Sequence, residues 1–397
     1  MSLLMPTDPA VLAAAVVDTL VIASDARARH ASIFYWERGR SDAQAVVAAV
    51  DRVEDADIRR LAATLQADST DPAVYYELKE RLTVARPEPL FRLAWLAECN
   101  SRLGFHLGPH YDRSGAAAVP AGALQAMSAG ERLPDDAPAP ILVVVPFRDQ
   151  GADGRRLRNL LACLLGLRDQ SVPRESYRVV VVESDEVPRW RDAITPYTDH
   201  YLFARKPGAF NKSWAVNVGV VNSPGEAELI CILDADVLVD RDFVKRNVAR
   251  FQKPGRMGHL SYRNMWTLDE SATCWAIEQR LRRHAAEVDP IELRAFVLRR
   301  PPGCCVWVRT SAYHRIGGMD ERFEGWGGED NDFAYRMDTN NAFDSYDDML
   351  LHMYHPPSAV LRDDGEIVNA HIPGLSWRSD AVIGDINRFA DGLVEAS

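Results

Sequence analysis

From residue 141 onward, short runs of β-branched and other apolar residues alternate with segments of helical spacing. Uninterrupted apolar runs separated by helices are typical of parallel strands that helices cover on both faces. The pattern therefore predicts an α/β fold with a mostly parallel sheet flanked by helices. The expected strands are residues 141–145, 177–183, 201–204, 229–233, 259–262 and 305–308, and the expected helices are 155–167, 212–221, 242–251, 272–286 and one that begins near 310 and stops at Gly317 and Gly318.

The first third of the chain has a different pattern of apolar residues. Apolar residues recur there at three- and four-residue intervals, which predicts several helices over residues 1–133. Residues 134–140 contain three prolines and no helical pattern, so we expect an extended linker. Residues 358–397 have mixed polarity and are expected to form a C-terminal tail.

Composition and charge narrow the class of protein. The 397 residues include 46 Lys and Arg and 57 Asp and Glu, giving a formal net charge of −11. Because phosphate backbones require concentrated cationic charge, this balance disfavours general nucleic-acid binding. The apolar run at residues 10–24 contains Asp18 and lacks a basic leader, which predicts neither a signal peptide nor a membrane span. The six cysteines show no metal-site spacing and are expected to be reduced packing residues, so we predict a cytoplasmic protein.

Two carboxylates, Asp234 and Asp236, directly follow the apolar run 229–233. In open parallel sheets ligands bind outside the carboxyl ends of the strands, where these side chains would emerge. Hard oxygen ligands at such a loop suit Mn²⁺ or Mg²⁺ bridging a diphosphate. Taken alone, such a pair is more often a turn former or a helix cap.

A second cluster runs from Glu324 to Asp332 and reads EGWGGEDND. Its glycines allow close backbone approach and an exposed Trp326, and the acids follow at an expected helix start. An aromatic face beside carboxylates can hold a sugar. A glycine-rich turn with acids at a helix N-terminus would explain the acids, but not the Gly-Trp-Gly-Gly arrangement.

Met349, His352 and His355 form a third group. Each of them alone is more typical of a packed side chain or a turn residue. Two imidazoles three residues apart, taken together with the Asp pair, favour a nitrogen ligand for the same metal ion.

Four motifs follow one another along the chain, namely Pro146-Phe147-Arg148, Phe210-Asn211-Lys212, Asp234-Ala235-Asp236 and Gly325-Trp326-Gly327-Gly328-Glu329-Asp330. Their order and rough spacing resemble those of GT-A fold glycosyltransferases. The resemblance is to the inverting family-two enzymes and, in the C-terminal region, to the β-1,4-galactosyltransferases. It covers about residues 141–357, its last motif is highly specific, and the N-terminal third lies outside it.

The resemblance implies a GT-A fold, which is Rossmann-like, with a helical N-terminal extension. Residues 141–256 would form the nucleotide-sugar-binding subdomain. Residues 257–357 would form the acceptor-binding and catalytic subdomain.

The resemblance also implies a nucleotide-diphosphate sugar as donor. Pro146, Phe147 and Arg148, on the loop after the first strand, would hold the nucleotide. Glu183, at the end of the second strand, would meet the base or the ribose.

Further donor contacts are implied at the second and third motifs. Lys212, with Asn211 before it, would bind the phosphates as a point charge where the galactosyltransferases have arginine. Asp234, with Ala235 beside it, would contact the ribose or the donor sugar.

Asp236 would ligate Mn²⁺ or Mg²⁺. His352 is similar in placement to the family's metal histidine, and Met349 and His355 remain open as alternatives.

The residues of the last motif would bind the acceptor and activate its hydroxyl group. Trp326, Gly327, Gly328 and Glu329 would bind the sugar, and Asp330 would be the catalytic base. Asp330 would take the acceptor hydroxyl proton as that oxygen attacks the anomeric carbon opposite the diphosphate, which inverts the configuration. A retaining outcome is less favoured because a carboxylate aimed at the acceptor is what a single displacement requires.

The sequence constrains the identity of the donor and the acceptor less than it constrains the type of reaction. A UDP-hexose is the leading donor, and a small-molecule or natural-product hydroxyl is the leading acceptor, with polysaccharide extension as the alternative. The N-terminal helices would close over the acceptor, mediate self-association as a homo-oligomer, or only cover a sheet edge. Two rival functions are a metal-dependent nucleotidyltransferase and a non-catalytic sugar-binding module. The first would need a glycine-rich basic phosphate loop, and the second would not need the nucleotide-side motifs.

Overall fold

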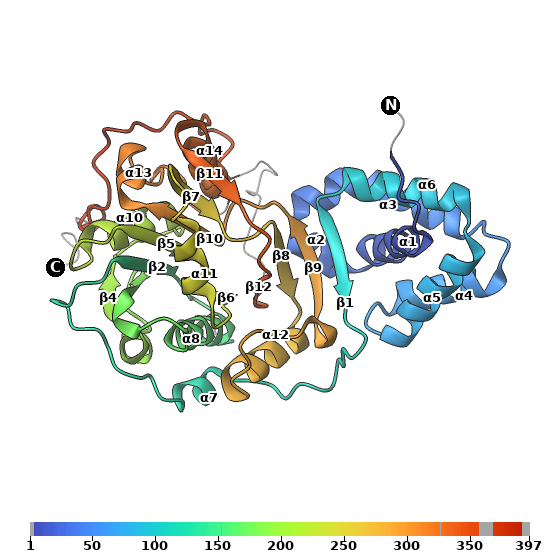
Figure 1. Cartoon of the computed structure of the whole chain (residues 1–397), viewed down its shortest axis with the longest axis horizontal. Coiled ribbons are helices and arrows are strands. Elements are labelled where there is room, and N and C mark those ends of the chain that lie inside the picture. The colour runs from blue at the N-terminus through green and yellow to red at the C-terminus, as the bar shows by residue number, and fades with distance from the viewer. Residues whose placement is uncertain (1–3, 152, 326, 357–367, 391–397) are drawn as a thin grey trace, which may run out of the picture.

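A computed structural model describes residues 4–151, 153–325, 327–356 and 368–390 (Figure 1). The larger of its two sheets contains β2 (Ile141–Phe147), β3 (Tyr177–Glu183), β4 (His200–Phe203), β5 (Leu229–Leu233), β7 (Arg256–Leu260), β10 (Cys305–Arg309) and β11 (Ala342–Ser345). Its strand order is β11-β7-β10-β5-β2-β3-β4, and β10 runs antiparallel to both of its neighbours. Strands β2 to β5 are parallel, so the predicted α/β fold with a mostly parallel sheet is confirmed.

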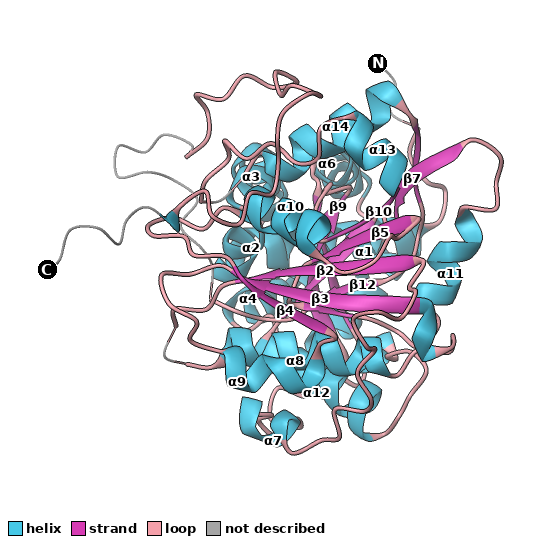
Figure 2. Ribbon diagram, turned by 90° about the vertical axis from the view of Figure 1, so that its left-hand side faces the viewer, coloured by secondary structure: helices cyan, strands magenta, loops and turns pink. Residues whose placement is uncertain are grey.

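Helices cover both faces of this sheet. Successive side chains of β2 enter different cores, with Val143 packed on the α8 side (Arg155–Arg168) and Val144 on the α10 side (Lys212–Asn222). This double burial explains why the strands read as continuous apolar runs. Figure 2 shows the sheet between the two helical layers, with two more helices on the α10 side, α13 (Thr310–Arg315) and α14 (Glu329–Asn340).

A second sheet was not predicted. Its strand order is β1-β9-β8-β12-β6. Strand β1 lies in the region expected to be helical and pairs with β9, which joins the N-terminal third to this sheet. Strand β12 lies between β6 and β8 near the centre of Figure 1. The five strands are β1 (Leu103–Leu107), β6 (Val237–Leu238), β8 (Asn264–Leu268), β9 (Arg294–Arg299) and β12 (Leu350–His352).

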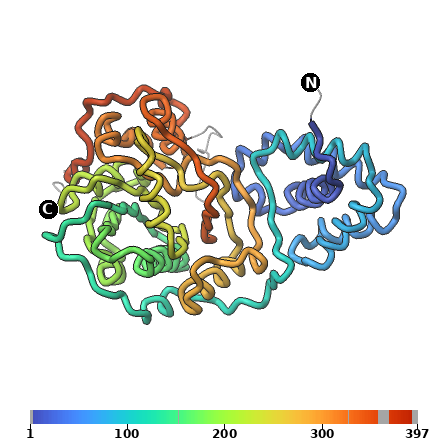
Figure 3. Tube along the Cα trace, in the orientation of Figure 1, coloured from blue at the N-terminus to red at the C-terminus, as the bar shows by residue number. Residues whose placement is uncertain are grey.

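The expected N-terminal helices are present and form the blue to cyan lobe of Figure 3. Helix α1 is apolar on nearly every side because other helices surround it, which explains the apolar run at residues 10–24. No helix among the described residues is both long and apolar enough to cross a bilayer. The six helices are α1 (Pro9–Ser24), α2 (Ala26–Ala31), α3 (Ile33–Val50), α4 (Ala56–Ala67), α5 (Pro72–Ala85) and α6 (Glu88–Asn100).

Four further helices lie between successive strands along the chain. They are α7 (Ala121–Gln125), α9 (Arg191–Ile194), α11 (Phe243–Arg250) and α12 (Glu270–Ile277). The single long helix expected over residues 272–286 is instead α12 followed by a π-helical turn at Glu278–Arg282. All six cysteines are free, but Cys99 is exposed and not a packing residue.

A buried ion-pair cluster fastens the N-terminal helices to the second sheet. The guanidinium of Arg294 on β9 is 1% exposed and donates to Asp25 Oδ2 at 2.5 Å and to Ser69 Oγ at 2.9 Å. Asp25 also caps α2, and Arg27 in α2 pairs with Asp269, the N-cap of α12. Burial opposes the charge on Asp25, but Arg27 and Arg294 outweigh it and hold the pKa of that carboxyl well below its usual range.

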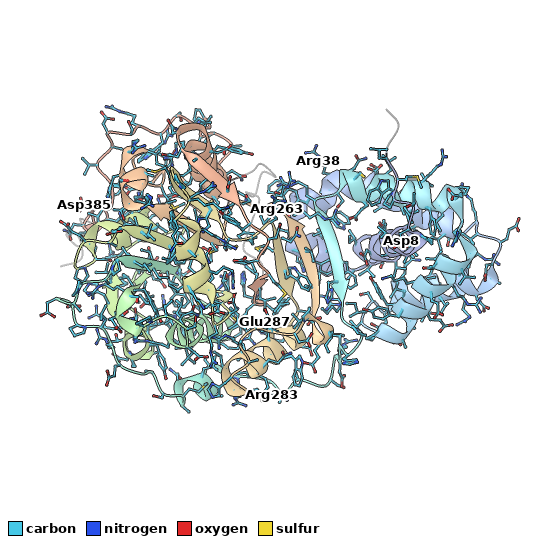
Figure 4. The ribbon with its side chains drawn as sticks, viewed as in Figure 1. Asp8, Arg38, Arg263, Arg283, Glu287 and Asp385 are labelled. Carbon is cyan, nitrogen blue, oxygen red and sulfur yellow. The ribbon has the colours of Figure 1, made fainter. Side chains whose placement is uncertain are left out.

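The replacement Asp25→Ala tests this cluster. It removes the nearer of the two carboxylates that contact the buried Arg294 and leaves Asp269 at 3.4 Å, so we expect the free energy of unfolding to fall by about 3 kcal/mol. The control is Asp8→Ala, because Asp8 (labelled in Figure 4) caps α1 at the surface, where a loss of about 1 kcal/mol is expected. Urea denaturation measures both, and equal losses would contradict the proposed fastening.

Candidate active site

The loop from Asp234 to Asp236 follows β5 at the carboxyl end of the parallel strands. Neighbouring segments hold it from two sides. The amide of Asp234 donates to the Cys304 carbonyl at 2.8 Å, and the amide of Met353 donates to the Asp236 carbonyl at 2.8 Å. Ala235 between them packs against the main hydrophobic core. Both carboxylates are therefore presented from a backbone that is anchored before any ligand binds.

Lys212 lies between two carboxylates from distant parts of the chain. Its Nζ is 2.8 Å from Asp234 Oδ1 and 3.1 Å from Asp330 Oδ2. Burial disfavours the ammonium, but the two carboxylates raise the pKa of Lys212 well above its usual value. The second, third and fourth motifs of the sequence thus meet at one charged group.

Two hydrogen bonds bring the N-termini of α10 and α14 together. The amide of Gly325 donates to the Phe210 carbonyl at 2.7 Å. Asn211 donates to the Glu321 carbonyl at 2.8 Å, and its side-chain oxygen caps α10 by accepting from the Trp214 amide. Asn211 is fully buried, so its contribution to the site is to position Lys212, the next residue.

Glycines are required where backbone approaches the acidic groups. A Cβ on Gly303 would lie 2.1 Å from Asp330 Oδ2. Gly328, with φ of +99°, precedes α14, and a Cβ there would lie 2.6 Å from the Phe323 ring. Gly327 also has positive φ, and its carbonyl accepts from Asn369 at 2.8 Å. Trp326 lies outside the described residues.

A second group of polar side chains surrounds Asp236. His355 Nε2 is 3.0 Å from Asp236 Oδ2, and His352 Nε2 is 3.4 Å from Asp236 Oδ1. The pairing of β12 with β6 places His352 opposite Val237, beside the acidic loop. One atom from each of the three side chains lies within 4.8 Å of the others, the spacing of a metal-ligand set. Met349 packs against the main core.

Of the residues expected to hold the nucleotide, some are buried and one is partly exposed. Pro146 and Phe147 are buried within β2, paired with β3, so the loop expected to contain them begins only at Arg148. Arg148 is partly exposed, and its guanidinium lies 3.4 Å from Asp185. Glu183 has no exposed surface and accepts hydrogen bonds from the Arg189 and Trp190 amides and the Tyr201 hydroxyl, which orders the loop after β3 and leaves its carboxylate covered.

Burial and like charge alter the ionisation of the acids on α14. Burial and the neighbouring Asp330 raise the pKa of Glu329 to about 7, and Glu329 Oε2 is buried without a hydrogen-bond partner. Burial also raises the pKa of Asp330, an effect that Lys212 partly offsets. A carboxyl pKa raised by burial is characteristic of groups that exchange protons in catalysis.

Three residues that contribute contacts or charge to the site were not identified from the sequence. Arg156, at the start of α8, adds positive charge near Asp236 and the two histidines. Asp185 fixes Arg148, and Asn369 joins the C-terminal segment to the glycine-rich loop. The two arginines after residue 154 were a visible signal for Arg156, whereas an isolated Asp or Asn carries none.

Two family models match this part of the chain. Residues 143–316 match glycosyl transferase family 2, and residues 296–355 match the N-terminal domain of galactosyltransferase. The chain contains a glycosyltransferase domain. The predicted resemblance is confirmed, and the matched residues include most of β2, Lys212, the acidic loop, the last motif and both histidines. A comparison with the curated proteins found no match.

Solved glycosyltransferase structures are similar at low identity. A mannosyltransferase from Pyrobaculum calidifontis in complex with GDP-Man and Mn²⁺ is 17% identical, with 62% of this chain and 64% of that chain covered and a TM-score of 0.36. S. aureus TarS in complex with UDP-GlcNAc is 14% identical, with 54% and 58% covered and a TM-score of 0.38. The Drosophila beta1,4galactosyltransferase 7 catalytic domain with xylobiose is 18% identical, with 54% and 71% covered and a TM-score of 0.31. The chain thus spans less than two thirds of the first two, and the glycosyltransferase assignment stands on the family models.

The replacement Glu329→Gln tests the environment of the acidic cluster. The folded glycosyltransferase keeps a proton on Glu329 up to about pH 7, whereas the unfolded chain releases it near the ordinary pKa of 4.5. The parent therefore loses stability as pH rises from about 4.5 through 7, and the variant is spared this loss. We expect the Tm of Glu329→Gln to exceed that of the parent by several degrees at pH 8.5 and by little at pH 4.5. Calorimetry at both pH values measures this, with exposed Glu131→Gln as control, and a pH-independent offset would contradict it.

Proposed function

We propose that the protein is a metal-dependent, inverting glycosyltransferase that moves a hexose from a nucleotide-diphosphate donor to an acceptor hydroxyl. The observation that carries the proposal is the Lys212 ammonium held between Asp234 and Asp330, next to the Asp236 group. This arrangement joins a phosphate-binding cation, an anchored acidic loop and a buried carboxylate with a raised pKa. The family matches favour glycosyl transfer over both a nucleotidyltransferase and a non-catalytic sugar-binding module.

The residues around Asp236 fit a divalent metal ion. Asp236 Oδ1 and His352 Nδ1 are buried without hydrogen-bond partners, and His355 completes a set of one oxygen and two nitrogen donors. Mg²⁺ prefers oxygen ligands, so this mixed set favours Mn²⁺. When bound, the ion supplies positive charge against a diphosphate. Met349, an alternative from the sequence, packs in the core and is not needed for the set.

Lys212 links donor binding to the base. In the described structure its ammonium is shared between Asp234 and Asp330, and this positive charge lowers the pKa of Asp330. A donor phosphate competes for the same ammonium. As Lys212 turns to the phosphate, Asp330 loses part of its counter-charge, its pKa rises further, and it becomes a better proton acceptor. Lys212 also stabilises the leaving diphosphate as its charge grows.

Asp330 is proposed as the base for a single displacement. It takes the proton of the acceptor hydroxyl while that oxygen forms a bond to the anomeric carbon and the bond to the diphosphate breaks. Glu329, beside it on α14, is proposed to bind sugar hydroxyls. The donor is proposed to be a UDP-hexose, following the galactosyltransferase-like motif, with Arg148 on the nucleotide side. A small-molecule hydroxyl is the proposed acceptor, and polysaccharide extension is the alternative.

The replacement Asp330→Asn tests the proposed base. The parent is first given a panel of UDP- and GDP-hexoses with Mn²⁺, and release of free nucleotide diphosphate identifies the donor. We expect Asp330→Asn to lower kcat for this donor by at least about 100-fold, because the proton acceptor is lost. KM for the donor should not rise, because an amide competes less than a carboxylate for the Lys212 ammonium. Asp338→Asn, an exposed acid of the same helix, is the control and should match the parent. Turnover by Asp330→Asn within a fewfold of the parent would contradict the assignment, and no Mn²⁺-dependent turnover of any donor would contradict the function.

A further inference from the structure

A cavity of about 260 Å³ lies at the edge of the large sheet opposite the acidic loop. Residues near the start of three parallel strands line it, whereas the loop from Asp234 to Asp236 follows the carboxyl end of β5. The segment after α10 and the first turn of α13 complete the wall. The lining residues used below are Leu142, Arg178, Ser223, Ile230, Thr310 and His314.

Arg178 is the buried charge in this cavity. Its side chain is 1% exposed. Its Nη2 donates to the carbonyls of Pro134, Asp135 and Ala137 at 2.9, 3.2 and 2.8 Å, which ties the linker to β3. Its Nε and Nη1 have no hydrogen-bond partner. The Asp135 carboxylate is 3.7 Å from Nη1 and is 67% exposed, so the guanidinium lacks a close buried counter-charge.

A buried guanidinium whose nearest carboxylate is exposed and 3.7 Å away is costly, and an anion next to it lowers that cost. Among the lining residues, Arg178 carries the fixed positive charge. Thr310 and Ser223 use their hydroxyl protons on the carbonyls of Ala227 and Gly219, and His314 lies exposed at the rim. Glu226 is the carboxylate among the lining residues and is exposed. The inner wall thus joins a cation to the apolar side chains of Leu142 and Ile230.

We propose that this cavity binds a small oxyanion, a phosphate or a carboxylate, through Arg178. The volume exceeds that of one such anion and leaves room for several waters, each of which occupies about 30 Å³ in the liquid. Because Arg178 also holds residues 134–137, a bound anion stabilises the linker against opening as well as the sheet. The site is separate from the proposed donor site and does not depend on the glycosyltransferase assignment.

Thermal unfolding of the full chain in EDTA, at constant ionic strength adjusted with NaCl, tests the site. We expect inorganic phosphate or acetate to raise the Tm saturably by at least 2 °C, and the anion with the larger effect identifies the class. Ser223→Glu introduces a carboxylate into the cavity and should abolish the shift, whereas Ser223→Gln should keep at least half of it. Lys212→Gln should also keep the shift, because the donor site lies at the other edge of the sheet.

Hydrogen exchange on the unmodified chain gives a second readout if a variant fails to fold. The effective anion should slow exchange in residues 133–139 at least threefold and leave residues 234–236 unchanged. The proposal is overturned if neither anion shifts the Tm, if the shift is lost in Lys212→Gln, or if protection appears at 234–236 and not at 133–139.

Discussion

The central constraint in this structure is the attraction between one ammonium and two carboxylates on separate elements. Lys212 opens α10, Asp234 follows β5, and Asp330 lies in the first turn of α14, so the ion pairs connect three segments that are far apart in sequence. Without the cation, the carboxyl groups of Asp234, Glu329 and Asp330 would crowd together at one edge of the sheet. With it, Asp234 is held in place, and Asp330 remains beside a charge that a phosphate can draw away.

Backbone contacts around Lys212 fix the positions of the charged side chains. Gly303 passes so close to Asp330 that a Cβ there would displace the Asp330 carboxylate, and the Tyr262 hydroxyl donates to the Gly303 carbonyl. Phe210 and Asn211 bind the segment that leads into α14. Strand β12 delivers His352 to Asp236 by pairing with β6. The catalytic proposal therefore depends on packing in both sheets, although most of its side chains follow the larger one.

The larger sheet was predicted except for β11, and the smaller sheet was not predicted, for a physical reason. The strands Tyr177–Glu183 and Leu229–Leu233 are buried on both faces, so their sequences are apolar throughout and their bounds agree with the prediction. Strand β9 contains Arg294, whose charge is satisfied by Asp25 from a segment more than two hundred residues away, and a charged residue obscures a strand pattern. Gly104 in β1 accommodates the Arg299 side chain, and glycine is depleted in strands. Such strands depend on partners that one segment of sequence does not reveal.

The sequence also predicted only part of the candidate site. Motif spacing indicated Lys212, Asp234, Asp236 and Asp330, and the structure brings these residues into two adjacent groups. Spacing could not choose between His352 and His355, because the choice depends on the turn after β12, and both in fact approach Asp236. Glu183 ends β3, where a ligand residue would lie, yet hydrogen bonds from the following loop and from Tyr201 on β4 cover it.

The most direct test of this account is a crystal of the protein grown with Mn²⁺ and a nucleoside diphosphate, with diffraction recorded for the anomalous signal of manganese. The account predicts one strong peak within about 2.5 Å of Asp236 and at least one of the two histidines, with diphosphate oxygens on the ion and Lys212 turned from Asp330 to a phosphate. A peak elsewhere, or a diphosphate bound with Lys212 still between Asp234 and Asp330, would contradict it.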